Sequence, residues 1–225
     1  MLGSIFYNLN YLLFGRVIGL KYSQLGQDSW VLERSKNFKK SNRPFFFCDV
    51  GAGHPTKFSN TYLIEKHHGW NGLLIEIHPD RISLLTQMRR AKVIDCAVSD
   101  LPFEKFFLAK DPDFSYSSQI KNEDTHKLFE FSGVEKIVQG KRLDLILKEN
   151  EAPVNFEYLS VDVEGLEYKV LQTIDLNYWK PKLITIEHNF RPDRDLIHSY
   201  LKEFGYRRYS DSDTKWDDWY FLESL

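Results

Sequence analysis

Cysteine is scarce in this sequence, which has only Cys48 and Cys96 among its 225 residues. Both lie inside short apolar stretches, an arrangement typical of buried free thiols. A scaffold held together by disulfides is therefore not indicated. We expect the protein in a reducing compartment, the cytoplasm.

An excess of positive charge is also missing. Lys and Arg together number 30 and Asp and Glu 32, which gives a formal net charge of −2. Proteins that bind nucleic acid neutralise its phosphates with an excess of Lys and Arg, so this balance argues against a nucleic-acid partner. Hydrophobic residues make up 42% of the chain, enough for one sizeable core.

The chain has no uninterrupted apolar run long enough to cross a bilayer. Residues 1–20 come nearest, because Arg16 is their only charged side chain, but Asn8, Asn10 and Gly15 break the run. The basic start and the small-residue cleavage site of a signal peptide are lacking. We therefore expect an N-terminal hydrophobic helix over residues 1–20. It would pack on its own domain, on a second copy of the chain as a homodimer, or on a membrane surface, and these alternatives stay open.

Internal repeats and low-complexity linkers are absent too, which favours a single domain over residues 21–225. From residue 45 onward, short apolar stretches alternate with helical patterns. The expected strands are 45–50, 72–77, 92–98, 156–161 and 183–187. The expected helices are 57–68, 79–89, 166–172 and 193–204. This alternation predicts an α/β fold with a mostly parallel, doubly wound sheet and helices on both faces.

Two segments depart from the regular alternation. Residues 206–209 and 218–221 predict an antiparallel strand pair at the C-terminal end. Residues from about 101 to 150 are expected to form an insertion, because their pattern is less regular. Within the insertion the sequence predicts strands at 103–109 and 136–139, a polar loop at 110–118, and helices at 124–131 and 142–150.

The first motif is a buried strand that runs into a glycine-rich turn over residues 45–53. Glycine lacks a Cβ, so the backbone at Gly51 and Gly53 can approach a ligand closely. Asp49 stands at the end of the strand, and ligands of doubly wound sheets bind beside the carboxyl ends of the strands. The turn therefore predicts a ligand site, although glycine turns after strands are common.

An acid at the end of the next strand strengthens this prediction. Glu76 follows Gly53 by 23 positions, and an acid there can accept hydrogen bonds from the hydroxyls of a ribose. The simpler alternative is a carboxylate that caps the following helix. Both NAD and S-adenosylmethionine carry a ribose. NAD needs a third glycine to hold its pyrophosphate, and this chain has Thr56 there, which favours S-adenosylmethionine.

Paired acids follow a later strand. Asp162 and Glu164 come directly after the buried stretch 156–161 and are followed by Gly165. This strand should lie beside the first one, so its end faces the reacting end of the ligand. Paired carboxylates there can hold a divalent metal such as Mg²⁺, orient a sugar hydroxyl or take its proton. The alternative is that both acids cap the following helix.

Two further candidate bases end the next strand. Glu187 is its last residue and His188 follows it, again at the carboxyl edge of the sheet. The pKa of a histidine ring suits proton transfer near neutral pH. A hydrogen-bonded structural histidine is an equally good interpretation of His188.

The order and spacing of these motifs resemble the FkbM family of S-adenosylmethionine-dependent methyltransferases. The resemblance covers most of the chain from Tyr22 to about Phe190. It rests on the stretches 22–28 (YSQLGQD), 48–53 (CDVGAG), 59–65 (SNTYLIE), 69–76 (GWNGLLIE), 96–100 (CAVSD), 159–165 (LSVDVEG) and 184–187 (ITIE). One departure is 54–56 (HPT), where many relatives continue with a polar residue and a glycine. It bears on the shape of the loop more than on its role.

The resemblance implies a Rossmann-like class I methyltransferase that methylates a hydroxyl of a small-molecule or glycan acceptor, such as a sugar or a related metabolite. It also implies that S-adenosylmethionine is bound by Gln27, Asp28, Asp49, Gly51, Gly53, Asn60, Glu76, Asp95, Cys96, Ala97 and Asp162. Gln24 would reach the pocket from outside the sheet. The catalytic candidates are Asp162, Glu164 and His188.

Two other functions stay open. Methyltransferases that act on amines often carry Asn/Asp-Pro-Pro-aromatic after the fourth strand, where this chain has residues 162–165 (DVEG). Residues 111–114 (DPDF) look similar but fall in the expected polar loop. The second alternative is a non-catalytic, cofactor-binding partner of a glycan-modifying enzyme, and the acids at Asp162 and Glu164 argue against it.

Overall fold

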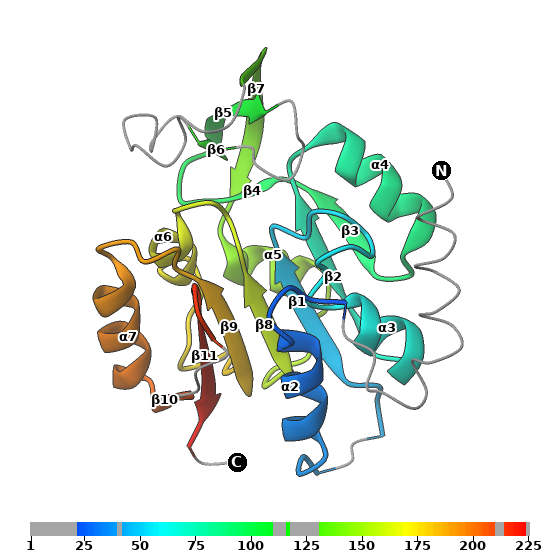
Figure 1. The fold of residues 1–225 in the computed structure, drawn as a ribbon, viewed down its shortest axis with the longest axis vertical. Helices are drawn as coiled ribbons and strands as arrows, with labels where there is room; N and C mark the ends of the chain where they lie inside the picture. The colour runs from blue at the N-terminus through cyan, green and yellow to red at the C-terminus, as the bar shows by residue number, and fades with distance from the viewer. Residues whose placement is uncertain (1–21, 40–41, 110–115, 118–130, 210–213, 224–225) are drawn as a thin grey trace.

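The computed structural model describes residues 22–39, 42–109, 116–117, 131–209 and 214–223 (Figure 1). Its helices are α2 (Gln27–Ser35), α3 (Tyr62–His68), α4 (Pro79–Met88), α5 (Leu143–Glu149), α6 (Glu167–Leu171) and α7 (Arg194–Glu203). Its strands are β1 (Phe46–Val50), β2 (Asn71–Glu76), β3 (Lys92–Asp95), β4 (Ala97–Val98), β5 (Phe103–Ala109), β6 (Tyr116–Ser117), β7 (Phe131–Lys141), β8 (Tyr158–Val161), β9 (Leu183–Glu187), β10 (Tyr206–Tyr209) and β11 (Asp217–Leu222). A small sheet stands at one end of the central one.

The central sheet has seven strands in the order β10-β11-β9-β8-β1-β2-β3. The neighbours from β9 to β3 are parallel, whereas β11 runs antiparallel to both β9 and β10. The predicted fold, a mostly parallel doubly wound sheet with a C-terminal antiparallel strand pair, is therefore confirmed. Chain order reverses beside β1, because β2 and β8 flank it, and ligands of such sheets bind at this point.

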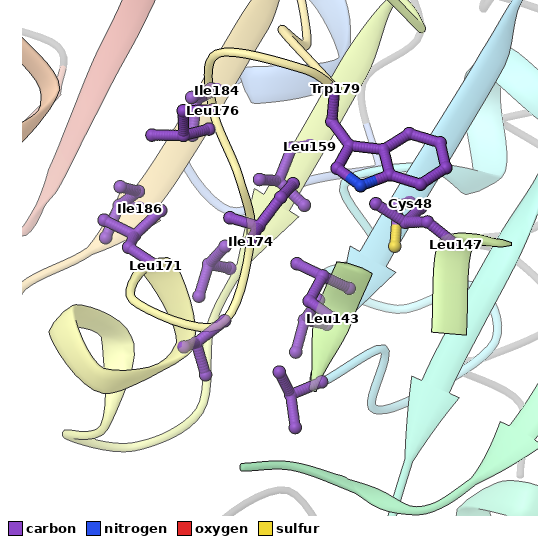
Figure 2. Close-up of a cluster of buried hydrophobic side chains, with 14 of the residues drawn as sticks. Cys48, Leu143, Leu147, Leu159, Leu171, Ile174, Leu176, Trp179, Ile184 and Ile186 are labelled. Carbon is purple, nitrogen blue, oxygen red and sulfur yellow. The ribbon is translucent and has the colours of Figure 1, made fainter. Parts of the chain in front are cut away.

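Two apolar clusters cover the two faces of the central sheet. In β1, Phe47 packs in the cluster that includes side chains of α2, α3 and α4. Cys48 and Val50 pack in the other cluster, with side chains of α5, α6 and α7. Figure 2 shows this second cluster, where Leu143 and Leu147 of α5 lie close to the strands. Burial on both faces explains why the central strands are nearly continuous apolar stretches.

The segment expected as an insertion forms most of the small sheet, whose strand order is β4-β7-β5-β6. The strand expected at 136–139 is part of the longer β7, which pairs antiparallel with β5. The strand expected at 92–98 is divided at Cys96: β3 joins the central sheet and β4 joins the small one. The last part of the expected insertion, α5, packs in the central core.

Some element boundaries differ from the sequence prediction. The helix expected at 57–68 begins only at Tyr62, because Phe58 has a φ of 59°, a left-handed conformation that a helix does not allow. α2 is mostly polar and has no sequence prediction. The helix expected at 124–131 lies outside the described residues except at Phe131, which begins β7. In the loop expected at 110–118, the described residues are those of β6.

The expected N-terminal helix, residues 1–20, lies outside the part of the chain that the structure describes. Among the described helices, none has both the length and the apolar character needed to span a bilayer. The role of residues 1–20 and the boundary of the domain at residue 21 stay predictions.

Gly51 and Gly69 allow a matched test of how closely the backbone packs. Both have a positive φ, 81° and 71°. A Cβ at Gly51 would stand 1.7 Å from the carbonyl oxygen of Asp162, whereas a Cβ at Gly69 would meet no atom within 4 Å. We expect Gly69→Ala to lower the free energy of unfolding by about 1–2 kcal/mol, the cost of its left-handed φ. Gly51→Ala should lower it by about 4 kcal/mol or more, because the backbone after β8 must also move.

Urea unfolding of both variants measures this difference. Equal losses of stability would contradict the close approach of the turn after β1 to the end of β8.

Candidate active site

A cavity opens at the carboxyl ends of the central strands. Its wall is formed by the turns after β1 and β8, the last residues of β2, and Glu187 at the end of β9. The small sheet borders the cavity through Glu104 and Phe106 of β5. The expected site residues that line it are Gly51, Gly53, Glu76, Cys96, Ala97, Asp162 and Glu164. Gln24 and Glu187, which the sequence also singles out, lie in the same wall.

The glycine turn after β1 is held from both sides. Gly51 and Ala52 donate their backbone N–H groups to the carbonyl oxygen of Ile75, at 3.0 and 3.1 Å. On the other side Gly51 lies so close to the carbonyl oxygen of Asp162 that no side chain fits between them. The turn is therefore fixed between β2 and β8.

Glu76 connects this turn to the end of β2. Its Oε2 accepts a hydrogen bond from the N–H of Gly53 at 2.8 Å, and its Oε1 accepts from the N–H groups of Ile77 and His78 at 2.7 and 2.8 Å. Burial raises the pKa of Glu76, and the three bonds oppose this rise because they stabilise the carboxylate. Oε1 already accepts two hydrogen bonds, whereas Oε2 accepts one and keeps a lone pair with which Glu76 can accept a hydrogen bond from a ligand.

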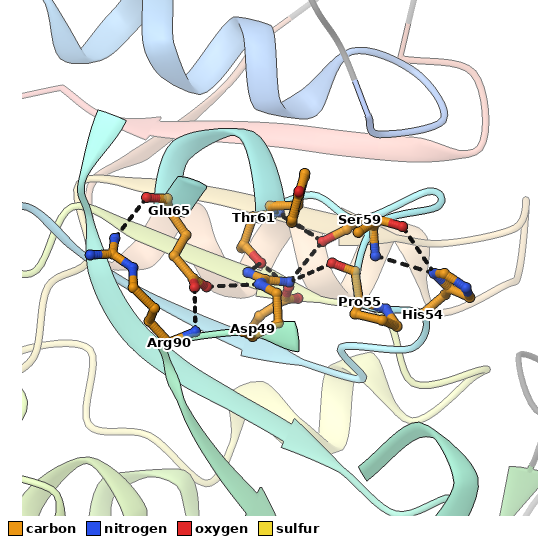
Figure 3. Close-up of polar contacts among 10 residues, drawn as sticks. Asp49, His54, Pro55, Ser59, Thr61, Glu65 and Arg90 are labelled. Atoms are coloured by element: carbon orange, nitrogen blue, oxygen red, sulfur yellow. Dashed lines mark hydrogen bonds and ion pairs between the residues drawn. The ribbon is translucent and has the colours of Figure 1, made fainter. Parts of the chain in front are cut away.

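A buried arginine, Arg89, organises the loop between the turn and α3. Figure 3 labels its partners Glu65, Thr61, Ser59 and Pro55. Arg89 follows α4, and its Nε donates to Oε2 of Glu65 at 2.7 Å. Its Nη2 donates to the hydroxyl of Thr61 at 2.9 Å. Its Nη1 donates to the carbonyl of Pro55 at 3.1 Å and to the hydroxyl of Ser59 at 3.2 Å. The side chain of Arg89 thus connects the end of α4 with α3 and with the loop that precedes α3.

Asp49 and Asn60 belong to the same region of polar contacts. Asp49 accepts a hydrogen bond from the hydroxyl of Thr61 at 2.7 Å, and Asn60 donates to the hydroxyl of Ser160 at 3.0 Å. Burial raises the pKa of Asp49, although the bond from Thr61 and the charge of Arg89 lower it. Among the described residues, neither is part of the cavity wall. Their role in cofactor binding stays a prediction.

Gln27 and Asp28 begin α2, and neither is in the cavity wall formed by the described residues. Asp28 accepts hydrogen bonds from the N–H groups of Tyr22 and Ser23 and, at 2.7 Å, from the hydroxyl of Ser23. Gln27 donates from Nε2 to Oδ2 of Asp217 at 2.5 Å. These contacts connect the start of the described chain with β11 near its end.

Asp95 and His188 also lie outside the wall that the described residues form. Asp95 is half-exposed and lies 3.2 Å from Nζ of Lys136. His188 is buried, and its Nδ1 accepts a hydrogen bond from the N–H of Phe190 at 2.9 Å. Its Nε2 lies 3.8 Å from Asp218. Burial lowers the pKa of His188, although Asp218 raises it, so the ring favours its neutral form.

Acids gather at the end of the cavity formed by β8 and β9. Asp162 and Glu164 follow β8, and Glu187 ends β9, its neighbour in the sheet. Asp162 and Glu187 have carboxylate oxygens within 4.8 Å of each other, so two negative charges would stand close together here. Burial, Glu187 and Glu164 raise the pKa of Asp162 well above its usual range. Burial and Glu164 raise the pKa of Glu187 to about 8.

The backbone turns sharply at Glu164, which explains how Asp162 and Glu164 line the same cavity. Glu164 has a φ of 55° and Gly165 one of 109°. Both acids lie beyond the end of β8, so the turn sets the directions of their side chains, and the alternation of an extended strand does not apply to them. A left-handed conformation at a residue other than glycine costs on the order of 1–3 kcal/mol and is concentrated at functional sites.

Sequence reasoning missed Arg89 and the two cavity residues of β5. Glu104 shares a buried face of β5 with Phe106 and Leu108, but Phe107 on the other face is buried as well, so no clear period-two pattern marks the two residues. An acid at such a position is a signal in itself, because a buried carboxylate needs partners. No local pattern marks Arg89, whose partners lie 24 to 34 positions earlier in the chain.

A comparison with protein families identifies the family to which the chain belongs. The model of the "Methyltransferase FkbM domain" matches residues 49–208, more than half of the chain. The chain belongs to the FkbM methyltransferase family. It is therefore an S-adenosylmethionine-dependent methyltransferase, and the prediction from the sequence motifs is confirmed. A comparison with curated proteins returns no match for this methyltransferase.

Solved structures support the fold. "Human methyltransferase 10 domain containing protein" superposes with a TM-score of 0.50 and 14% identity, over 97% of this chain and 93% of that one. The "delta-N METTL16 MTase domain" gives a TM-score of 0.50 and 13% identity, over 96% of this chain and 91% of that one. At these identities the likeness concerns the class I methyltransferase fold alone.

The cavity suits S-adenosylmethionine chemically. The close approach of Gly51 to the backbone of Asp162 leaves the turn free of side-chain bulk beside the ligand. Glu76 offers a lone pair of Oε2 to a ribose hydroxyl. Apolar side chains of Val98 and Phe106 stand in the wall near Cys96, where a flat base can lie. The residues present therefore fit the cofactor that the family uses.

Replacement of Arg89 tests whether the buried ion pair stabilises the loop between the glycine turn and α3. Arg89→Met should lower the free energy of unfolding by about 3–5 kcal/mol, because it leaves the buried Glu65 without its cation. The control is Lys105→Met, which breaks a half-exposed ion pair with Glu135 and should cost less than about 1 kcal/mol. Thermal and urea unfolding measure both changes. A loss for Arg89→Met no larger than that of the control would show that the loop does not depend on the buried pair.

Proposed function

We propose that this methyltransferase methylates a hydroxyl oxygen of a sugar, a glycan or a related small metabolite. The observation that supports the proposal is the position of three acids, Asp162, Glu164 and Glu187, in the same cavity as the glycine turn and Glu76. A hydroxyl is a weak nucleophile until its proton is removed, and a carboxylate beside it can accept that proton.

Bound S-adenosylmethionine supplies a methyl group attached to a sulfonium sulfur. This sulfur leaves readily, because it departs as a neutral thioether. In the proposed arrangement Glu76 accepts a hydrogen bond from a ribose hydroxyl. The backbone of Gly51 and Gly53 lies against the methionine part, and Cys96 and Ala97 flank the adenine. The chain's main contribution is alignment, because methyl transfer requires the attacking oxygen, the carbon and the sulfur in line.

Glu164 is the residue we assign to proton removal. Asp162 and Glu187 have carboxylate oxygens within 4.8 Å of each other, whereas Glu164 lines the cavity from the turn that follows β8. His188 faces Asp218 instead, so we assign it a positioning role behind the cavity.

Amine methylation is the rival activity, and membership of a methyltransferase family stands against a non-catalytic role. The Asn/Asp-Pro-Pro-aromatic segment of amine methyltransferases is absent from residues 162–165, and acids in the cavity argue against a passive partner. The proposal has three further parts. They are dependence on a divalent metal, a cytoplasmic location, and contact of residues 1–20 with a membrane or a second copy of the chain. Residues 1–20 lie outside the described chain.

Replacement of Glu76 tests the cofactor site. We expect Glu76→Gln to weaken binding of S-adenosylhomocysteine by about 1–3 kcal/mol, because hydrogen bonds to a charged group are lost. The comparison variant is Glu149→Gln, a half-exposed carboxylate of α5 that pairs with Lys141 and is not part of the described cavity wall. It should change the affinity by less than about 0.5 kcal/mol. Isothermal titration calorimetry measures both, and an unchanged affinity of Glu76→Gln would refute the assignment to ribose.

Replacement of Glu164 tests the chemistry. Glu164→Gln keeps the shape of the side chain and removes its charge, so turnover should fall by about 10²–10⁴-fold, the usual contribution of a general base. The readout is formation of S-adenosylhomocysteine with panels of hydroxylated and amino acceptors. Binding of S-adenosylhomocysteine by the variant serves as the control for folding. Wild-type turnover with amines alone would refute O-methylation, and full turnover of Glu164→Gln would refute its role as base.

A further inference from the structure

Three carboxylates from separate elements converge at the acidic end of the cavity. They are Asp162 after β8, Glu187 at the end of β9 and Glu167, the first residue of α6. One carboxylate oxygen of each lies within 4.8 Å of an oxygen of each of the others. The sequence points to the first two, whereas Glu167 is brought to them only by the fold.

Glu167 carries an observation of its own. Its side chain is buried, with 1% of the residue exposed. Its Oε1 accepts hydrogen bonds from the N–H groups of Val163 and Gly165, at 3.1 and 2.9 Å. Its Oε2 is buried and has no hydrogen-bond partner among the described residues. A buried carboxylate oxygen without a donor is costly, so this atom indicates a ligand that supplies positive charge.

The electrostatic surroundings point the same way. Glu164 and Asp217 act on both Asp162 and Glu187, and Glu167 acts on Glu187. Each of these contributions raises the pKa of its target, which means that negative charge is crowded at this end of the cavity. A cation bound among the carboxylates would relieve this repulsion.

We propose that Asp162, Glu167 and Glu187 bind one divalent metal cation of the oxygen-preferring kind, such as Mg²⁺. All three ligands are carboxylates, which suit Mg²⁺ or Mn²⁺ better than softer metals. Carboxylate oxygens within 4.8 Å of one another can close around one ion with small side-chain movements, and the water molecules that Mg²⁺ retains would fill the other positions. The inference rests on the proposed function only for the role of the ion. Beside an acceptor hydroxyl, it would favour loss of the hydroxyl proton.

The test titrates Mn²⁺ into the full chain without cofactor or acceptor and follows free Mn²⁺ by electron paramagnetic resonance. We expect one saturable site per chain, from which Mg²⁺ displaces the Mn²⁺. Glu167→Gln keeps an oxygen that can accept from Val163 and Gly165 but removes the charge, so the affinity should fall about tenfold or more. Asp193→Asn is the matched control, because it removes a charge that acts on Glu167 from outside the group. It should change the affinity less than about threefold.

Absence of saturable binding would overturn the proposal, and so would an equal loss of affinity in the two variants. If circular dichroism shows that Glu167→Gln does not fold, Glu187→Gln decides by the same tenfold criterion. The titration needs neither cofactor nor acceptor. A failure of metal binding therefore leaves the proposed methyl transfer standing, and a failure of methyl transfer leaves the metal site standing.

Discussion

The buried ion pair between Arg89 and Glu65 is the interaction on which the glycine-turn side of the cavity depends. A buried charge is tolerated only when it is paired and its hydrogen-bonding capacity is used, and Glu65 provides the pairing. The remaining donors reach Pro55, Ser59 and Thr61, which lie in the loop between the glycine turn and α3. That loop departs from the family at residues 54–56. Its shape is set largely by a side chain that follows α4.

The two ends of the cavity are built on different principles. At the glycine turn, backbone groups and Glu76 form a surface whose polar atoms are matched by N–H donors. At the ends of β8 and β9, carboxylates stand close together, and burial and the neighbouring acids raise the pKa of Asp162. The first arrangement favours stable binding of a neutral, hydroxyl-rich group. The second favours a ligand that brings positive charge or that gives up a proton, as a hydroxyl group would in the proposed methyl transfer.

The sequence was sufficient for the features that depend on local pattern and chain order. Apolar stretches ending in Gly51, Glu76 and Asp162 predicted the strands and the edge at which they meet, because parallel strands expose their carboxyl ends together. It was insufficient where the decisive contact is distant. The division of 92–98 at Cys96 depends on pairing of β4 with β7, more than 40 positions later. No local pattern singles out Glu167, because its unpartnered oxygen is visible only once α6 is placed.

The position of β11 has a consequence for the order in which the protein assembles. Because β11 lies between β9 and β10, the strand made earlier, β10, has no neighbour in the central sheet until the last strand arrives. Until β11 is in place, β9 therefore presents an open edge. Glu187 lies at the end of that edge, and Asp217 pairs with it from β11. A variant without β11 would keep the glycine turn and the three acids of the cavity, but the strand that ends at Glu187 would be left with an unpaired edge.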